Sequence, residues 1–240
     1  MYEDYVFNKG MLLKSLEGYH YALLDSQDII SGTLSGTFDA LIMPGGADLY
    51  FCEKLNGRAN RIITSYVENG GNYIGLCAGA YYGCHAIEWA KDEGTEAVIG
   101  TRELAFYSGK AVGPIYQYIE ERDFSKSWDG CAQIQFQSED PLTVWYAGGP
   151  MFEEPSHANE RVRARYADLP GKPPAIVHIE VGKGRAILAG PHIEVNADLY
   201  KNKITGHANP AYDRQQTVLA ELTKDTVKQR RLWRELLESL

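Results

Sequence analysis

The sequence predicts an α/β fold, a three-layer sandwich with a mostly parallel central sheet, β-rich insertions and a C-terminal helix. Two short apolar segments, residues 38–43 and 72–76, each stop at a tight turn, as buried strands of a parallel sheet do. A segment with helical spacing separates them, and strand, helix, strand forms a right-handed crossover. From about residue 97 to 190 the pattern changes to short β-like segments, which predicts insertions rich in strands.

The elements before and within this crossover follow from periodicity. We expect a helix over residues 2–16 and a strand over residues 19–24. The crossover helix ends at Gly70-Gly71, which supplies a left-handed stop. Its apolar face consists of Ala59, Ile62, Ile63, Tyr66 and Val67.

Beyond the crossover, small residues open a further helix that we expect over residues 78–91, packed closely on the sheet. Gly182-Lys-Gly184 is a hairpin signal between the last two of the later strands. These later strands are expected at residues 104–107, 131–136, 142–146, 175–181 and 185–189.

The end of the chain is predicted to be helical. Residues 210–240 form a C-terminal extension whose apolar stripe docks on the domain or on a second subunit. The stripe consists of Leu232, Trp233, Leu236, Leu237 and Leu240. With no internal repeat, low-complexity tract or Gly/Ser linker, residues 1–240 are interpreted as one domain.

Composition excludes several classes of function. The chain has 24 basic and 32 acidic residues, a net charge of −8, and its Lys and Arg residues are dispersed, so neither nucleic acid nor a membrane surface is an expected partner. No run approaches the roughly 18 apolar residues of a membrane helix, and the N-terminus lacks a signal-peptide pattern, so we expect a cytoplasmic protein. The four cysteines lack C-x-x-C spacing and are expected to be free thiols; no metal site and no cofactor are expected.

One of these cysteines occupies a special position. Gly75-Leu-Cys-Ala-Gly79 follows a predicted strand and precedes a predicted helix, which is the setting of a nucleophile elbow. The N-terminus of a helix favours the thiolate of Cys77 over the thiol. Backbone N–H groups of Ala78 and Gly79, and of Gly45 and Gly46 after the neighbouring strand, are candidate oxyanion or substrate-binding groups. The alternative interpretation is that Cys77 is a small buried apolar residue in a tight turn.

A thiolate nucleophile also needs a general base. His192 follows the predicted strand 185–189 through Gly190-Pro191, so it lies at a strand end, on the edge of the sheet where Cys77 is expected. Glu194 is placed to accept a hydrogen bond from the imidazole and to fix its tautomer. Alone, His192 could be a capping or surface histidine and Glu194 a solvated acid; together with the elbow, they predict a Cys-His-Glu triad.

These residues resemble the class I glutamine amidotransferase-like superfamily, whose fold is flavodoxin-like. Gly75 to Gly79 match its G-x-C-x-G elbow, and His192 with Glu194 match its late His-x-Glu pair. Within the superfamily the chain looks most like the amidotransferase-like N-terminal domain of biotin-protein ligases and its stand-alone relatives. Pro44-Gly-Gly-Ala-Asp48, Gly75-Leu-Cys-Ala-Gly-Ala-Tyr-Tyr-Gly83 and Tyr146-Ala-Gly-Gly149 carry that similarity.

Three departures from these families bear on function. Tyr81 stands where glutamine amidotransferases have a glutamine, which argues against glutamine as the substrate. The chain contains no G-R-G-R-x-x-R biotinyl-adenylate loop, so we do not expect it to be a biotin ligase itself. It also opens with a helix-like segment where the family usually opens with a parallel strand.

Three functions are therefore left open. The first is a cysteine hydrolase or amidotransferase acting on a small amide or acyl compound. The second is a non-catalytic binding or regulatory module with a biotin-ligase-related protein as partner. The third is a redox or chaperone role, as in related cysteine proteins, although those place a glutamate before the elbow and Met43-Pro44-Gly45-Gly46 offers none.

Overall fold

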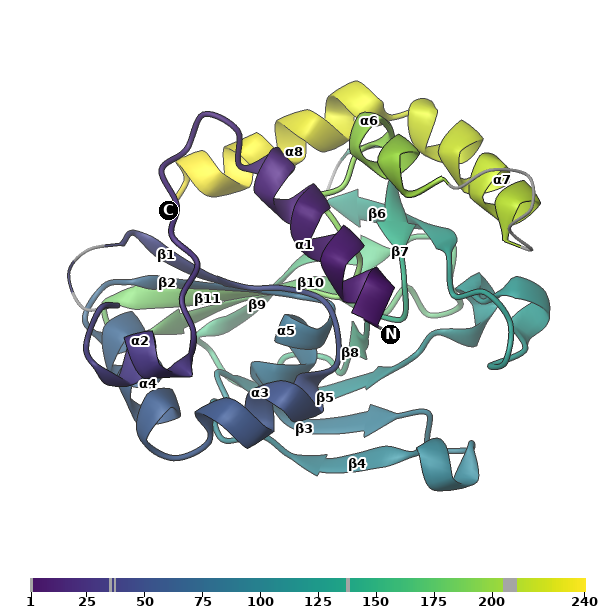
Figure 1. Cartoon of the computed structure of the whole chain (residues 1–240). Coiled ribbons are helices and arrows are strands. Elements are labelled where there is room, and N and C mark those ends of the chain that lie inside the picture. The colour runs from purple at the N-terminus through teal and green to yellow at the C-terminus, as the bar shows by residue number, and fades with distance from the viewer. Residues whose placement is uncertain (1, 35, 37, 137–138, 205–210) are drawn as a thin grey trace.

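A seven-stranded sheet crosses the centre of the computed structural model, which describes residues 2–34, 36, 38–136, 139–204 and 211–240 (Figure 1). In spatial order its strands are β1 (Ala40–Met43), β2 (Asn72–Leu76), β11 (Gly184–Ala189), β10 (Pro174–Val181), β9 (Glu160–Tyr166), β6 (Gly130–Phe136) and β7 (Leu142–Tyr146). A second sheet has the order β4 (Val98–Thr101), β3 (Cys84–Trp89), β5 (Tyr107–Gly113) and β8 (Met151–Phe152).

The central sheet is parallel only in β1, β2 and β11, and its other neighbouring strands are antiparallel. The α/β fold class is confirmed, but the expected mostly parallel sheet holds for these three strands alone. The physical reason is the length of the connections. The crossover between β1 and β2 contains helices, whereas β10 and β11 are joined by the predicted Gly182 hairpin, which forces opposite strand directions.

Successive residues along a strand point to opposite faces of the sheet, and here the two faces contribute to two different cores. In β2, Tyr73 belongs to one core, while Ile74 and Leu76 belong to the other. In β11, Leu188 and Ile187 divide in the same way. The two central strands are thus covered on both faces, which is why they are continuously apolar.

Helices cover both faces of the sheet (Figure 1). The first core includes residues of α2 (Ser26–Ile30), α3 (Asp48–Leu55), α4 (Arg58–Glu68) and α5 (Ala78–Tyr82). The second core includes residues of α1 (Tyr2–Ser15) and α8 (Thr226–Glu238). Beside them lie α6 (Ala197–Tyr200) and α7 (Tyr212–Thr223), and both contribute to a third cluster around Trp145.

The helix expected over residues 78–91 is wrong beyond its first turn. After α5 ends at Tyr82, residues 84–89 form β3, which pairs with β4 and β5. Small residues made this segment compatible with a helix, but pairing with two strands distant in sequence decides the outcome.

Two expected strands are also wrong in position. Residues 19–24 join no sheet, and Tyr21 and Leu23 are more than half exposed. Residues 104–106 are irregular, because Ala105 adopts a φ of 44°, which an extended strand does not allow; β5 begins only at Tyr107.

The C-terminal extension consists of two helices, α7 and α8, and its predicted start at residue 210 lies outside the described residues. The predicted apolar stripe of α8 packs on this chain's own second core, with Trp233 only 4% exposed. None of the helices in the described part of the chain combines the length and the apolar character that crossing a membrane requires.

Candidate functional site

The carboxyl ends of the three parallel strands meet at one edge of the sheet. Met43 of β1 pairs with Gly75 of β2, and Leu76 of β2 pairs with Ala189 of β11. The chain after β1 is Pro44-Gly45-Gly46, after β2 it is Cys77, and after β11 it reaches His192. The topology therefore brings the three predicted segments to the same edge, where open α/β sheets hold their ligands.

Cys77 occupies a strained turn between β2 and α5. Its φ of 52° and ψ of −103° are unusual for a residue with a side chain, and such conformations cost about 1–3 kcal/mol. Backbone hydrogen bonds hold the turn: Cys77 N–H donates to the carbonyl of Ala189 (2.9 Å), and Ala80 N–H donates to the carbonyl of Cys77 (3.0 Å). This is the backbone geometry of a nucleophile elbow.

Both glycines of the elbow are required by close backbone contacts. A Cβ on Gly75 would lie 2.4 Å from the carbonyl oxygen of Gly79, and a Cβ on Gly79 would lie 2.2 Å from that of Met43. The N–H of Gly79 donates to the carbonyl of Pro44 (3.1 Å). Gly79 therefore joins the elbow to the end of β1, and its N–H is not a free donor for a substrate, contrary to the expectation.

The helix that follows Cys77 is shorter than expected. With five residues, α5 forms little more than one turn, so its dipole is weaker than that of the longer helix predicted. Its first residue, Ala78, has no carbonyl one turn earlier in the helix to accept its N–H. The favourable effect of this helix end on a negative group beside it is correspondingly small.

His192 and Glu194 form a buried pair beside this turn. Its Nδ1 lies 2.7 Å from Oε1 of Glu194, and the two side chains are only 1% and 4% exposed. Burial lowers the pKa of His192. The charge of Glu194, its hydrogen bond to Nδ1 and the charge of Cys77 act in the opposite direction, outweigh burial and raise the pKa to about 10. The imidazolium is therefore the favoured form at neutral pH.

Cys77, His192 and Gly45 are in immediate contact. A Cβ built on Gly45 would lie 2.7 Å from Cε1 of His192, 3.3 Å from its Nε2 and 3.5 Å from Cβ of Cys77. The buried Nε2 makes no hydrogen bond within the described residues, and the Cys77 thiol donates to the carbonyl of Ala147 (3.5 Å). The Nε2 of His192 and the sulfur of Cys77 therefore lie beside the same small space, which a side chain at position 45 would fill.

A platform of residues that the sequence did not reveal holds the imidazole in place. The backbone N–H of His192 donates to the carbonyl of Trp145 (2.9 Å), and the two rings stack with centroids 4.4 Å apart. Nε1 of Trp145 donates to Asp129 (2.8 Å), which also pairs with Lys203 (2.8 Å). Lys203 Nζ lies 4.7 Å from the Trp145 ring centre. The sequence offered one signal: an aromatic residue inside a buried strand next to the Tyr146-Ala-Gly-Gly149 motif.

An extended cleft of about 2880 Å³ borders Cys77 and reaches as far as residues of α1, α2 and α8. Gly45, Gly46 and Ala78 line it together with Cys77, so three of the four predicted oxyanion or substrate-binding residues border the open space. Tyr81 also lines it, and its hydroxyl donates to the carbonyl of Gly148 (3.2 Å). Tyr81 therefore occupies the site wall one helical turn from Cys77.

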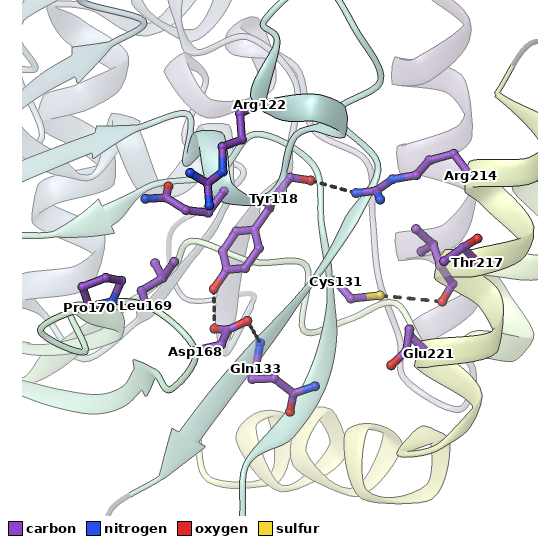
Figure 2. Close-up of a pocket in the computed structure, with 12 residues that line it drawn as sticks. Tyr118, Arg122, Cys131, Gln133, Asp168, Leu169, Pro170, Arg214, Thr217 and Glu221 are labelled. Carbon is purple, nitrogen blue, oxygen red and sulfur yellow. Dashed lines mark hydrogen bonds between the residues drawn. The ribbon is translucent and has the colours of Figure 1, made fainter.

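A second cavity of about 730 Å³ lies beside β6, against α7 (Figure 2). Its polar groups satisfy one another: the Tyr118 hydroxyl donates to Asp168 (2.5 Å), and Arg214 donates to the carbonyl of Tyr118 (3.0 Å). None of the predicted site residues lines this cavity. Its Cys131 is a poor nucleophile, because burial raises the pKa of its thiol to about 12.

The remaining cysteines are also unsuited to nucleophilic chemistry. Burial raises the pKa of Cys52 and raises that of Cys84 well above its usual value. Across the described residues, no group of three or more His, Cys, Asp and Glu side chains is arranged to hold a metal ion.

Comparison with known proteins gives one family for nearly the whole chain. Residues 10–240 match the family described as "Biotin-protein ligase, N terminal". Over 160 residues the chain is 38% identical to an uncharacterised protein of Chlamydia muridarum (strain MoPn / Nigg), covering 66% of this chain and 61% of that protein. Over 166 residues it is 34% identical to a biotin–protein ligase of Schizosaccharomyces pombe, covering 66% of this chain and 26% of the ligase.

The chain thus spans about three fifths of one of these relatives and about a quarter of the other. Among solved structures, a glutamine amidotransferase superposes on 89% of this chain and 93% of its own, with a TM-score of 0.53 and 16% sequence identity. At that identity the likeness concerns the fold.

Proposed function

The chain belongs to the family of biotin-protein ligase N-terminal domains and has a glutamine amidotransferase-like fold, and from this premise we propose that it is a cysteine-nucleophile amidase, hydrolase or amidotransferase. The observation that carries the proposal is the buried His192–Glu194 pair. Among the described residues the Nε2 of His192 has no hydrogen-bond partner, and it lies against Gly45 beside Cys77. A buried imidazolium next to a strained cysteine is the arrangement that generates a thiolate at neutral pH.

The reaction would proceed in two steps. The Cys77 thiolate adds to the acyl carbon of an amide, while backbone N–H groups of Ala78 and of Gly45 or Gly46 hold the oxyanion. The carbon–nitrogen bond then breaks, the leaving amine takes a proton from His192, and a thioester remains on the sulfur. Water or an acceptor amine next attacks the thioester and gives a proton to His192, and the thiolate leaves.

The identity of the substrate is restricted by Tyr81. Its ring is buried in the wall of the cleft, its hydroxyl donates to the carbonyl of Gly148, and it stands where glutamine amidotransferases have a glutamine. This supports an amide or acyl compound other than glutamine. The four unpaired cysteines support a cytoplasmic location, where thiols stay reduced.

The reactivity of Cys77 with iodoacetamide tests the proposal. We expect Cys77 to be alkylated between about pH 5 and pH 7 faster than a free cysteine, because the buried imidazolium of His192 lies beside it and favours negative charge on the sulfur. Peptide mass spectrometry follows Cys77 and, as an internal reference, the half-buried Cys52. His192→Gln should lower the rate at Cys77 about tenfold or more at pH 6 and leave that at Cys52 unchanged. A Cys77 rate that follows the free-thiol curve in both proteins contradicts the proposal.

A second candidate is a non-catalytic binding module that retains the elbow, with a biotin-ligase-related protein as partner. The observation that favours it is the same Tyr81, which lies in the wall of the cleft where glutamine amidotransferases have a glutamine. Cys77→Ala separates the two functions. Undiminished binding of such a partner by the variant, together with no turnover by the native chain in a broad amide and ester screen, would favour the module.

A further inference from the structure

Three large aromatic side chains form a cluster in the wall of the cleft that contains Cys77. Trp89 is the last residue of β3, and Phe124 and Trp128 lie on the segment that leads into β6. All three are only half-buried, although they are among the most apolar side chains of the chain. Partly exposed aromatic rings that line a concave site supply a surface on which a ligand can bind.

The cluster adjoins the nucleophile through the Ala147-Gly148 backbone. The Cys77 thiol donates to the carbonyl of Ala147 (3.5 Å). A Cβ on Gly148, the next residue, would lie 3.1 Å from the Trp128 ring and 3.3 Å from the Trp89 ring. Gly148 has a φ of 81°, which a residue with a side chain rarely adopts. The chain thus brings two indole rings to within one residue of the group that contacts the reactive sulfur.

Tyr81 contacts both the turn at Cys77 and the aromatic cluster. It lies four residues after Cys77, its N–H donates to the carbonyl of Cys77 (3.1 Å), and its ring meets the Trp89 ring edge-on at 5.7 Å. The Trp128 Nε1 donates to the carbonyl of Phe124 (2.8 Å), which fixes the orientation of that ring. These contacts connect the aromatic surface to the turn that carries the nucleophile.

The spacing of the rings determines what they can bind. Trp89 and Trp128 have centroids 5.1 Å apart, and Phe124 and Trp128 have centroids 4.8 Å apart, so neighbouring rings touch. Rings that surround an ammonium group must leave room for it between them, and touching rings leave none. The cluster is a wall rather than a cage, and a wall of this kind binds one flat ring by offset or edge-to-face stacking.

From these observations we infer that the substrate of Cys77 carries an aromatic or heteroaromatic ring next to its scissile acyl group, bound against the wall of Trp89, Phe124 and Trp128. This inference rests on the proposed nucleophile and adds the substrate class. Tyr81, four residues after Cys77, forms the part of the wall that is closest to the sulfur along the chain.

Three alkylating probes of different side groups test the inference: iodoacetamide, N-benzyl iodoacetamide and the size-matched N-(cyclohexylmethyl) iodoacetamide. In each, the Cys77 sulfur displaces iodide, and each rate is divided by that of the same probe with glutathione. We expect the benzyl probe to label Cys77 about tenfold faster than iodoacetamide, and the cyclohexylmethyl probe to show clearly less gain, because stacking requires a flat ring. At Cys52 the three normalised rates should agree.

Variants locate the effect. Trp128→Leu keeps an apolar side chain but removes the ring, and should bring the benzyl-to-iodoacetamide rate ratio at Cys77 close to one. Phe136→Leu alters a half-buried ring of β6 outside the cleft, and should keep this ratio high. A Trp89→Leu variant repeats the test should Trp128→Leu fail to fold. Equal gains for the benzyl and cyclohexylmethyl probes, or a ratio unaffected by both tryptophan changes, would overturn the inference. Failure of iodoacetamide itself to label Cys77 faster than Cys52 would instead overturn the proposed nucleophile.

Discussion

Replacing Glu194 by Gln tests the electrostatic core of the site. The change keeps the size of the side chain and removes the charge that lies 2.7 Å from Nδ1 of His192. Burial lowers the pKa of His192 and the charge of Glu194 raises it, so removing the carboxylate should lower the pKa of the imidazole in the folded protein. The native protein, by contrast, holds the imidazolium up to a pKa of about 10.

The size of the effect follows from that difference. The pKa of His192 rises from 6.5 to about 10, and each pKa unit corresponds to about 1.4 kcal/mol, so the pair contributes a few kcal/mol to folding. Because the folded-state pKa lies above the unfolded one, this contribution is fully present below about pH 6.5 and is lost as the pH rises through about 10. We therefore expect Glu194→Gln to lower the free energy of unfolding by about 3–5 kcal/mol at pH 6.

Urea unfolding of both proteins at pH 6 and near pH 10 measures the effect. The destabilisation by Glu194→Gln should shrink at the higher pH, where about half of His192 is already neutral in the native protein. Glu180→Gln is the matched control, since Glu180 forms an exposed pair with Arg161 and should contribute less than about 1 kcal/mol at either pH. An equal destabilisation by Glu194→Gln at both pH values would refute the assignment of a buried imidazolium.

Two further predictions concern the support of the site. Gly79→Ala places a Cβ 2.2 Å from the carbonyl oxygen of Met43, so we expect a loss of about 2 kcal/mol or more in urea unfolding, whereas Gly10→Ala, with nothing within 4 Å in helix α1, should be neutral or stabilising by about 0.5–1 kcal/mol. Trp233→Ala removes a side chain that is 4% exposed and should cost about 3–5 kcal/mol, whereas Val227→Ala, at a position 78% exposed on the same helix, should change stability by less than about 0.5 kcal/mol. Comparable losses within either pair of variants would contradict the packing described.

The parts of the fold that depend on local pattern were predictable. The strands β1 and β2, the helix α4 between them and the β10–β11 hairpin all follow from apolar spacing and from the glycines that end them. Cys77 and His192 could be placed at one edge because parallel strands share the direction of their carboxyl ends. The strand β9 was missed, although residues 160–166 alternate arginine with buried side chains, which is a period-two signal.

The parts that depend on pairing between distant segments were not predictable. Residues 84–89 become a strand only because residues 98–101 and 107–113 lie beside them. The platform under His192 joins Trp145 of β7 to Asp129 and Lys203, which are separated from each other by more than seventy positions in the chain. No periodicity within a short window records such contacts, so the sequence indicated the reactive groups but not the groups that orient them.

The support of the His192–Glu194 segment gives the C-terminal extension a role in the site. Between these two residues, the carbonyl of Ile193 accepts a hydrogen bond from the buried side chain of Gln229 on α8. On the other side, His192 is bound to Trp145 of β7, and α8 itself is anchored by Trp233 in the core beneath β2 and β11. The strand end that carries the imidazole is therefore fixed from the sheet and from α8 together. A helix predicted only as a docked appendage is a structural part of the candidate site, which agrees with a family match that extends to residue 240.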